Sequence, residues 1–455
     1  MQQYSQKDET ICALATPFAE SALAVIRISG ENSHSIFRTV FSMKKAFSEA
    51  EGNTIVYGRI LDPAVPDCVI DEVMAAKYNA PKSYTGEDMV EVFCHGSLPG
   101  IQKIIELLLG NGARQALPGE FTFRAFMNGK LDLTRAEAVQ EIVSSKTRFS
   151  QRLAADRLTG SVEKEIDRVK SMVLDILASI ELTLDYPEDE VEDVVISPES
   201  LEAAAEHAER VSNTYNAGRL YQEGIQAALV GPTNAGKSSI FNMLVREDRA
   251  IVSEVHGTTR DYLETWITIQ GLPVKVFDTA GIRRTGNKIE AAGIQRSRQI
   301  IEKSDILVFI VDGTEGLTLE AESELSGMPE GKQVIKLWNK ADSENLLSVP
   351  EGYLAFSAVT GEGFEDLEDA IVSLVPDTGS ILEGAAVIDS QRQKALLDEA
   401  AESLRAAAEA VESGQSNDLV ALDVQEALTC LGEITGEVTS SEVLFHMFSN
   451  FCVGK

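Results

Sequence analysis

The stretch from residue 225 to residue 238 constrains the fold of this chain more than any other. It opens with the apolar run 225–230, which is typical of a buried strand. The chain then reads Gly231-Pro232-Thr233-Asn234-Ala235-Gly236-Lys237-Ser238, which matches the pattern GxxxxGK(S/T). In this pattern backbone N–H groups surround the phosphates, the lysine reaches the β and γ phosphates, and the hydroxyl binds Mg²⁺. Residues 239–244 then predict a helix whose N-terminal dipole faces the phosphates.

Later elements identify the base as guanine. Asn339-Lys340-Ala341-Asp342 matches NKxD and follows the apolar residues 333–338. The Asp342 carboxylate can accept from N1–H and N2–H₂ of guanine, and it would be left unpaired by the wrong base. Ser357-Ala358 resembles the loop that backs guanine in such domains.

The remaining elements of a GTPase are present in the correct order. Asp278-Thr279-Ala280-Gly281 matches DxxG, with Asp278 near Mg²⁺ and the Gly281 N–H facing the γ phosphate. Thr258-Thr259 lies in a predicted switch I, with Thr259 as a second Mg²⁺ ligand beside Ser238. The sequence therefore predicts a P-loop GTPase domain of the Ras-like α/β class that binds GTP with Mg²⁺. The candidate GTP-binding residues are Asn234, Ala235, Gly236, Lys237, Ser238, Ser239, Thr258, Thr259, Asp278, Thr279, Ala280, Gly281, Asn339, Lys340, Asp342, Ser357 and Ala358.

The residue that follows DxxG does not support the usual hydrolytic mechanism. Ras-like GTPases place there a glutamine that orients the attacking water, whereas this chain has Ile282. Arg260, Arg283 and Arg284 are candidates for an internal arginine finger, and ordinary loop solubility explains them equally well. Another group must therefore orient the water and offset the developing charge.

Composition bounds the class of protein. A chain of 455 residues exceeds one hydrophobic core, so two to four domains are expected. No apolar run approaches the length of a membrane span, and residues 1–9 do not resemble a secretory signal. Five cysteines without CxxC spacing argue against a disulfide framework or a zinc site and favour the cytoplasm. The formal charge of −32 means that an RNA partner would need a local basic patch or a second protein.

The periodicity of apolar residues divides the rest of the chain. Strands are predicted at 22–29, 53–61, 69–78 and 89–94, and helices at 33–41 and 98–109, which together form a small α/β domain. From Leu133 helical periodicity begins, and one long helix is predicted from Leu158 to Asp185, where Pro187 forbids continuation. The acidic run 188–193 is interpreted as a solvated loop, with cation binding as the alternative.

Helices flank the GTPase domain on both sides in sequence. Ser197 is a predicted N-cap, and its helix is expected to run toward Gly218. Helical periodicity returns at 390–411 and 418–432. The economical architecture is one helical domain split by the inserted nucleotide-binding domain.

The motifs outside the central segment resemble those of the MnmE family, also called TrmE, of tRNA-modification GTPases. The resemblance extends essentially from end to end. A departure is Pro17 to Ala22, where the family has a Pro-Gly-Arg-Gly-Gly segment. The matching stretches are Val25 to Gly30, Tyr84 to Asp88, Pro118 to Phe121, Asn128 to Leu133, Asn234 to Ser239, Gly257 to Asp261, Asp278 to Gly281 and Phe451-Cys452-Val453-Gly454-Lys455.

The resemblance implies that the chain divides into four consecutive parts. An N-terminal α/β domain that binds tetrahydrofolate and dimerises covers residues 1–122, and the first part of the helical domain covers 123–221. The GTPase domain covers 222–377, and the second part of the helical domain, with the cysteine-containing motif, covers 378–455.

The resemblance also implies a replacement for the missing glutamine. Family members hold K⁺ where an arginine finger would lie, and the site maps to Asn234, Ser253, Val255 and Thr258, with Ser253 also near the nucleotide. A catalytic glutamate acting through a water maps to Glu290, whose alternative role is a first-turn acid at a helix N-terminus. Lys237 completes the catalytic set on the phosphates.

The family's second site binds a reduced folate, either formyl- or methylene-tetrahydrofolate, as the one-carbon donor. The contacts map to Arg27, Glu91, Lys130 and Lys455, where the cations suit the glutamate tail and the acid suits the pterin N–H groups. An ordinary strand charge is the alternative for Arg27. Cys452 maps to the cysteine associated with the modification reaction, and as a lone cysteine it would be a core residue.

The implied activity is that of a homodimeric, K⁺-dependent GTPase. With a flavin-dependent partner of the GidA (MnmG) type, it would add an aminomethyl or carboxymethylaminomethyl group to C5 of the wobble uridine of certain tRNAs, and it would contact tRNA mainly through that partner. A ribosome-assembly GTPase is the first alternative. A membrane-associated GTPase of the dynamin type is the second, and the absence of a basic amphipathic segment argues against it.

Overall fold

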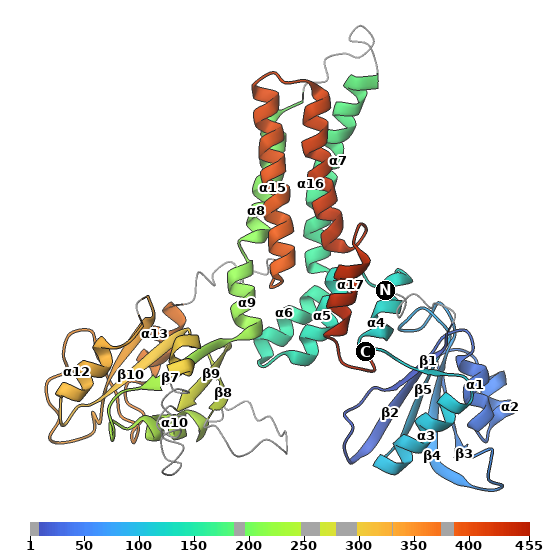
Figure 1. Cartoon of the computed structure of the whole chain (residues 1–455), viewed down its shortest axis with the longest axis horizontal. Coiled ribbons are helices and arrows are strands. Elements are labelled where there is room, and N and C mark those ends of the chain that lie inside the picture. The colour runs from blue at the N-terminus through green and yellow to red at the C-terminus, as the bar shows by residue number, and fades with distance from the viewer. Residues whose placement is uncertain (1–8, 186–195, 247–263, 279–297, 330, 375–385) are drawn as a thin grey trace. The chain divides into compact units, whose positions relative to one another are not determined.

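The computed structural model describes residues 9–185, 196–246, 264–278, 298–329, 331–374 and 386–455 (Figure 1). The chain divides into two compact units, Met1–Gln140 with Gln425–Lys455, and Glu141–Val424. No helix in the described ranges is long and apolar enough to cross a membrane. Each unit is built around a six-stranded sheet, and the second also contains long helices.

The sheet of the first unit has the strand order β3-β4-β5-β2-β1-β6. Neighbouring strands are antiparallel except for β1 and β6, which are parallel. The four strands predicted from alternation are present as β2–β5, whereas the short β1 and β6 were not predicted. The bounds are β1 (Ile11–Leu14), β2 (Ser21–Ser29), β3 (Thr54–Leu61), β4 (Val69–Tyr78), β5 (Met89–Gly96) and β6 (Arg114–Gln115).

Helices cover one face of this sheet, whereas on the other face α4 packs against β1 and the strands β3 and β4 stay open. Phe37, Phe41 and Phe47 from α1 and α2 and the apolar side of α3 pack against alternate strand residues to form a core. On the opposite face Ile55, Tyr57 and Met74 are exposed, at 62%, 62% and 43% of their surface. The helices of this unit are α1 (Ser33–Val40), α2 (Lys44–Glu49), α3 (Leu98–Gly110), α4 (Glu120–Met127) and α17 (Ser441–Ser449), and α5 (Leu133–Ser144) begins in it.

The sheet of the second unit has the order β12-β11-β10-β7-β9-β8, with only β8 antiparallel. All seven residues of β10 are buried, as expected for a central strand covered by helices on both faces. The strand predicted at 225–230 is confirmed as β7. The bounds are β7 (Ile225–Val230), β8 (Glu264–Ile269), β9 (Leu272–Asp278), β10 (Ile306–Asp312), β11 (Gln333–Asn339), β12 (Leu354–Ala355), α10 (Lys237–Arg246), α12 (Leu319–Ser326) and α13 (Phe364–Ser373).

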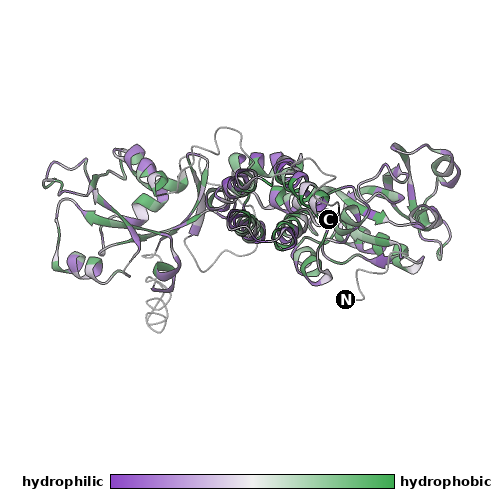
Figure 2. Ribbon diagram, turned by 90° about the horizontal axis from the view of Figure 1, so that it is seen from above, coloured by the Kyte–Doolittle hydropathy of each residue, from purple (hydrophilic) through white to green (hydrophobic). Residues whose placement is uncertain are grey.

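Long amphipathic helices form the rest of the second unit. Figure 2 shows hydrophobic and hydrophilic residues on different sides of these helices, as their periodicity predicts. Helix α8 packs along α15, and α7 packs on α8, so chain segments from before and after the nucleotide-binding domain form one bundle. The predicted split of a helical domain is therefore confirmed. The bounds are α6 (Arg148–Leu158), α7 (Ser161–Asp185), α8 (Pro198–Ser212), α9 (Tyr215–Glu223), α15 (Gln391–Glu412) and α16 (Asn417–Thr435), of which α16 begins in this unit and ends in the first.

A buried ion cluster links the segment that follows the nucleotide-binding domain to the helices. The guanidinium of Arg157, 2% exposed, contacts Glu141 at 2.6 Å and Asp389 at 2.8 Å, and it donates to the Val387 carbonyl oxygen at 3.1 Å. Burial raises the pKa of Asp389, although the Arg157 charge and a hydrogen bond with Glu141 act in the opposite direction. Arg157 thus anchors the segment through which the chain leaves the nucleotide-binding domain.

Two predicted helices are each interrupted in the structure. The helix expected from Leu158 is wrong at its start, because Leu158 ends α6 and Gly160, with φ 86°, separates it from α7. The helix capped by Ser197 ends at Ser212 rather than continuing to Gly218. Gly218 lies in α9, where a Cβ atom would stand 2.2 Å from the carbonyl oxygen of Ile388. Both interruptions reflect tertiary packing and backbone geometry that apolar periodicity does not contain.

Candidate functional site

The nucleotide motifs meet at one edge of the second unit's sheet. β7 runs directly into the loop that begins at Gly231, while β9, β10 and β11 end at Asp278, Asp312 and Asn339. Because these strands are parallel, their carboxyl ends share one edge. Ligands bind at this edge in open α/β sheets. The topology therefore brings together segments that lie about a hundred residues apart in sequence.

The phosphate loop has the backbone that its sequence predicts. Gly231 and Gly236 have φ of 134° and 101°, and Asn234 adopts a left-handed φ of 64°. A Cβ on Gly231 would lie 2.2 Å from the Ile310 carbonyl oxygen, so the loop approaches β10 too closely for a side chain. Helix α10 begins at Lys237, which directs its first N–H groups toward the loop.

Lys237 and Ser238 are held by groups of the site itself. The buried ammonium of Lys237 donates to the carbonyl oxygens of Gly231 and Pro232, at 2.6 and 2.5 Å. The hydroxyl of Ser238 donates to Asp278 Oδ2 at 2.7 Å, and Asp278 is fully buried. A hydroxyl and a carboxylate in contact are oxygen ligands of the kind that Mg²⁺ prefers beside phosphates.

The base motif is linked to the phosphate loop and to the segment after β12. Asn339 Nδ2 donates to the Ala235 carbonyl oxygen at 2.8 Å, and the Ala358 N–H donates to Asn339 Oδ1 at 3.4 Å. The hydroxyl of the buried Ser357 donates to Asp342 Oδ1 at 2.6 Å. The structure thus gathers these predicted base-site residues and orients the Asp342 carboxylate.

Several candidate residues lie outside the described ranges. They include most of the switch region and the proposed catalytic glutamate, so their positions stay predictions. Of the four K⁺ candidates only Asn234, which is exposed, is described. The candidates outside the described residues are Ser253, Val255, Thr258, Thr259, Arg260, Thr279, Ala280, Gly281, Ile282, Arg283, Arg284 and Glu290.

A second candidate site lies on the open face of the first unit's sheet. Arg27 on β2 donates from Nε to Glu91 Oε1 on β5 at 2.7 Å, and from Nη1 to the Gly454 carbonyl oxygen at 3.1 Å. The guanidinium lies over the Tyr84 ring, 5.4 Å from its centroid. Tyr78 donates its hydroxyl to the other Glu91 oxygen at 3.2 Å. Arg27 and Glu91 therefore form one ion pair on this face, and their assignment to the tail and the pterin of a folate stays a prediction.

The C-terminal segment forms one side of this site. Val453 pairs with Pro118, and the Gly119 N–H donates to the Cys452 carbonyl oxygen at 3.2 Å. Partial burial lowers the pKa of Lys455, and the neighbouring Arg27 charge lowers it further. Cys452 is exposed rather than a core residue. These contacts bring the segment with Cys452 and Lys455 to the Arg27–Glu91 pair.

Lys130 has a different environment from the other folate candidates. Its ammonium is exposed and donates to the Pro81 carbonyl oxygen at 3.0 Å. A Cβ on Gly86 would lie 3.4 Å from Lys130 Cγ, so the lysine stem lies along the loop of residues 84–88. No hydrogen bond joins Lys130 to Arg27, Glu91 or Lys455 among the described residues.

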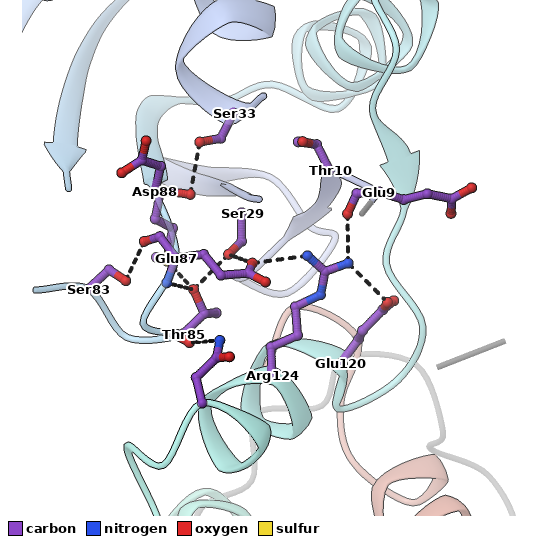
Figure 3. Close-up of polar contacts among 12 residues, drawn as sticks. Glu9, Thr10, Ser29, Ser33, Ser83, Thr85, Glu87, Asp88, Glu120 and Arg124 are labelled. Carbon is purple, nitrogen blue, oxygen red and sulfur yellow. Dashed lines mark hydrogen bonds and ion pairs between the residues drawn. The ribbon is translucent and has the colours of Figure 1, made fainter. Parts of the chain in front are cut away.

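A polar network fixes the loop that carries Tyr84 (Figure 3). Arg124 donates to Glu87 Oε2 at 2.9 Å and to the Glu9 carbonyl oxygen at 2.7 Å, with Glu120 3.6 Å away. Ser29 donates to the same Glu87 oxygen at 2.7 Å. The matching stretches Tyr84 to Asp88 and Pro118 to Phe121 thus supply a structural support for the site. A buried, satisfied network of this kind rigidifies its surroundings.

Sequence reasoning did not single out Asp312, Tyr78 or Arg124, and it named Tyr84 only as part of the matching stretch Tyr84 to Asp88. Asp312 had a readable signal, since an acid that directly follows a fully apolar strand takes the same position as Asp278. Tyr78 and Arg124 had no such signal, and the matching stretch gave no contact for Tyr84. Their contacts depend on strand register and on a segment from the other end of the chain.

Comparisons with known proteins cover nearly the whole chain. The family model of the MnmE helical domain matches residues 133–452, and that of the GTP-binding protein TrmE N-terminus matches residues 10–130. The tRNA modification GTPase MnmE of Carboxydothermus hydrogenoformans is 39% identical over 98% of this chain and 100% of its own length. The protein of that name from Borrelia recurrentis is 42% identical over 100% of both chains.

Two solved structures resemble about a third of the chain. Era from Aquifex aeolicus is 25% identical, covers 34% of this chain and 57% of its own, and has a TM-score of 0.28. The FeoB G domain from Methanococcus jannaschii is 30% identical, covers 34% of this chain and 98% of its own, and has a TM-score of 0.26.

Proposed function

The chain belongs to the MnmE family of tRNA modification GTPases, and from this membership we infer that it is a GTP hydrolase acting in tRNA modification. Two hydrogen bonds at one edge of the sheet carry this function: Ser238 bonds to Asp278, and Ser357 bonds to Asp342. A TrmE N-terminal domain precedes the GTPase motifs, and this domain argues against the ribosome-assembly alternative.

The site residues fit GTP and Mg²⁺. The loop leaves no room for side chains at Gly231 or Gly236, where a Cβ would lie 2.2 Å from the Ile310 oxygen and 2.1 Å from Asn339 Nδ2. Ser238 and Asp278 would hold the metal, with Thr259 as a further ligand, and Lys237 would exchange its carbonyl partners for phosphate oxygens. A bound Mg²⁺ offsets phosphate charge. Asp342, oriented by Ser357, would accept from the guanine N1–H and N2–H₂ groups.

We propose that a monovalent cation replaces the missing glutamine and arginine finger. Asn234, exposed on the loop, would hold K⁺ with Ser253, Val255 and Thr258, and Glu290 would orient a water. A cation beside the phosphates stabilises charge as it develops. The test compares GTP hydrolysis in K⁺ and Na⁺. We expect much faster hydrolysis in K⁺, with the difference abolished by Asn234→Ala; equal rates in both salts would contradict the K⁺ site.

We propose that the second site binds a reduced folate, which supplies the one-carbon unit. The support is the convergence of Arg27, Glu91 and the Lys455 segment, which join two strands and the C-terminus in one place. Glu91, held by Arg27 and Tyr78, would accept from pterin N–H groups. Lys455 would provide positive charge nearby, and Lys130 would contact the ligand only at its periphery.

We propose that the chain forms a homodimer and acts together with a second protein. An open sheet face with exposed Ile55, Tyr57 and Met74 supports homodimerisation, since such a row is costly to leave in water. The 72 acidic against 40 basic side chains support contact with tRNA through a second protein, which we propose to be flavin-dependent and of the GidA (MnmG) type. The product would be a wobble uridine with an aminomethyl-type group at C5, formed in the cytoplasm.

A further inference from the structure

Asp312 stands at the carboxyl end of β10, next to the base motif. Its side chain is 8% exposed, and its Oδ1 accepts from the Thr314 N–H at 2.9 Å and from the Thr314 hydroxyl at 2.6 Å. The other oxygen, Oδ2, accepts from the ammonium of Lys340. Thr314 thus fixes the rotation of the carboxylate and presents one oxygen to the lysine.

Lys340 is the lysine of the NKxD motif and has an unusual backbone. Its φ is 67°, in the left-handed region that residues other than glycine and asparagine rarely adopt. The flanking residues are tied down, since Asn339 accepts from the Gly313 N–H at 2.8 Å and Ala341 donates to the Phe356 carbonyl oxygen at 2.9 Å. The backbone and the ammonium of Lys340 are therefore both fixed, and its side chain is still 42% exposed.

The charge state of Asp312 suits an ion pair with the Lys340 ammonium. Burial acts to raise the pKa of Asp312, but hydrogen bonds from Lys340 and Thr314 outweigh burial and hold the pKa below its usual value. The Asp312 side chain is therefore a carboxylate at neutral pH. Ordering a long lysine side chain costs much rotamer entropy, and the ion pair with Asp312 offsets this cost.

We propose that Asp312 is a positioning residue for guanine recognition. By holding the ammonium of Lys340, it keeps the four-carbon stem as a fixed apolar wall beside Asp342, where one face of the purine ring would rest. Asp342 reads the edge of the base, and Lys340 covers its face. Without Asp312 the stem would move freely, and the base would dissociate faster.

The test is a double-mutant cycle on the full-length protein. Dissociation of N-methylanthraniloyl-GDP is followed by stopped flow for the wild type, Asp312→Asn, Lys340→Ala and the double variant. Asparagine can still accept from Thr314, but its amide cannot accept from Lys340 when so oriented. We expect Asp312→Asn to speed dissociation about tenfold, and to add less than about twofold in the Lys340→Ala background.

A matched control lies at the other end of the same strand. Asp305 precedes β10, and its Oδ2 accepts from the Gln226 N–H at 2.8 Å without a lysine. Asp305→Asn should leave dissociation within about twofold of the wild type, and thermal unfolding identifies any variant that is merely destabilised. Two results would overturn the proposal: Asp312→Asn with wild-type dissociation, or an equal effect of Asp312→Asn with and without Lys340.

Discussion

The Nε atom of Arg27 lies 2.7 Å from Glu91 Oε1, across directly paired positions of β2 and β5. The Arg27 side chain is 23% exposed and the Glu91 side chain is 14% exposed, so the ion pair is largely buried. An ion pair in such a place has lost part of its hydration, so it remains favourable only while both partners keep their hydrogen bonds. Tyr78 and Gly454 provide those bonds on either side.

The first prediction tests the role of Glu91. Glu91→Gln should weaken binding of 5-formyltetrahydrofolate at least about tenfold, because the ligand's N–H groups lose a charged acceptor and Arg27 loses its partner. Isothermal titration calorimetry measures the affinity. Glu72→Gln is the matched control, since Glu72 pairs with Arg59 on the same sheet but at a half-exposed position. Equal losses in both variants would contradict a binding role for Glu91.

The second prediction concerns the C-terminal segment. Gly454 has φ 94°, and a Cβ there would lie 2.3 Å from the Leu14 carbonyl oxygen. Gly454→Ala should therefore displace the segment and weaken folate binding about tenfold or more. Gly112→Ala is the control, because Gly112 has φ 104° but nothing within 4 Å of the added atom. Its cost should be backbone strain of about 1–3 kcal/mol, with folate affinity retained. Comparable folate affinities for the two variants would contradict a role of the C-terminal segment in this site.

Sequence reasoning succeeded where the chemistry is local. The bounds of β7 follow from one apolar run that ends in a phosphate loop, and the carboxyl-end positions of Asp278 and Asn339 follow from motifs next to strands. It failed where distant segments decide the outcome. Arg27 and Gly454 are 427 positions apart, and no pattern near either residue indicates the other; only the family resemblance assigned Arg27 and Lys455 to one site.

The third prediction follows from the burial of Asp389. A carboxyl whose folded-state pKa is raised contributes stability that is full below its unfolded value, near 3.8, and is lost as the pH rises through the folded value. Asp389→Asn stays neutral, so it should be at least as stable as the wild type at pH 7.5, and the difference should shrink toward pH 4. Each pKa unit corresponds to about 1.4 kcal/mol.

Urea unfolding followed by tryptophan fluorescence measures this effect. Both tryptophans, Trp266 and Trp338, lie in the unit that contains Asp389, so the signal reports that unit. Asp398→Asn, at a half-exposed position, is the control and should show no such pH dependence. An Asp389→Asn variant that loses stability equally at pH 4 and pH 7.5 would show that the carboxylate charge, rather than its burial, dominates.

The fourth prediction tests the identity of the base. Asp342→Asn replaces an acceptor by an amide that donates toward the base, so it should clash with the donor edge of guanine and suit the C2 carbonyl of xanthine. We expect GDP affinity to fall at least about 100-fold and XDP to bind more tightly than GDP. Competition against a fluorescent nucleotide measures both affinities. Unchanged preference for GDP would remove Asp342 from base recognition.

Interruptions of the helices show a second limit of sequence reasoning. The apolar spacing continues from Leu158 into α7, yet Gly160 breaks the helix with φ 86°. Likewise, α8 ends before Thr214, whose hydroxyl accepts from the Ile388 N–H at 3.1 Å. That contact uses a residue beyond the nucleotide-binding domain, so only the folded chain can supply the reason for the break.

We propose that the nucleotide site and the Arg27–Glu91 site serve one and the same modification of tRNA. Mass spectrometry of tRNA nucleosides, from a strain that lacks this chain and carries a wild-type or variant copy, tests this most directly. We predict that the C5-modified wobble uridine is absent without the chain, returns with the wild type and Glu72→Gln, and stays absent with Ser238→Ala or Glu91→Gln. Unchanged wobble uridines in the strain without the chain would contradict the account.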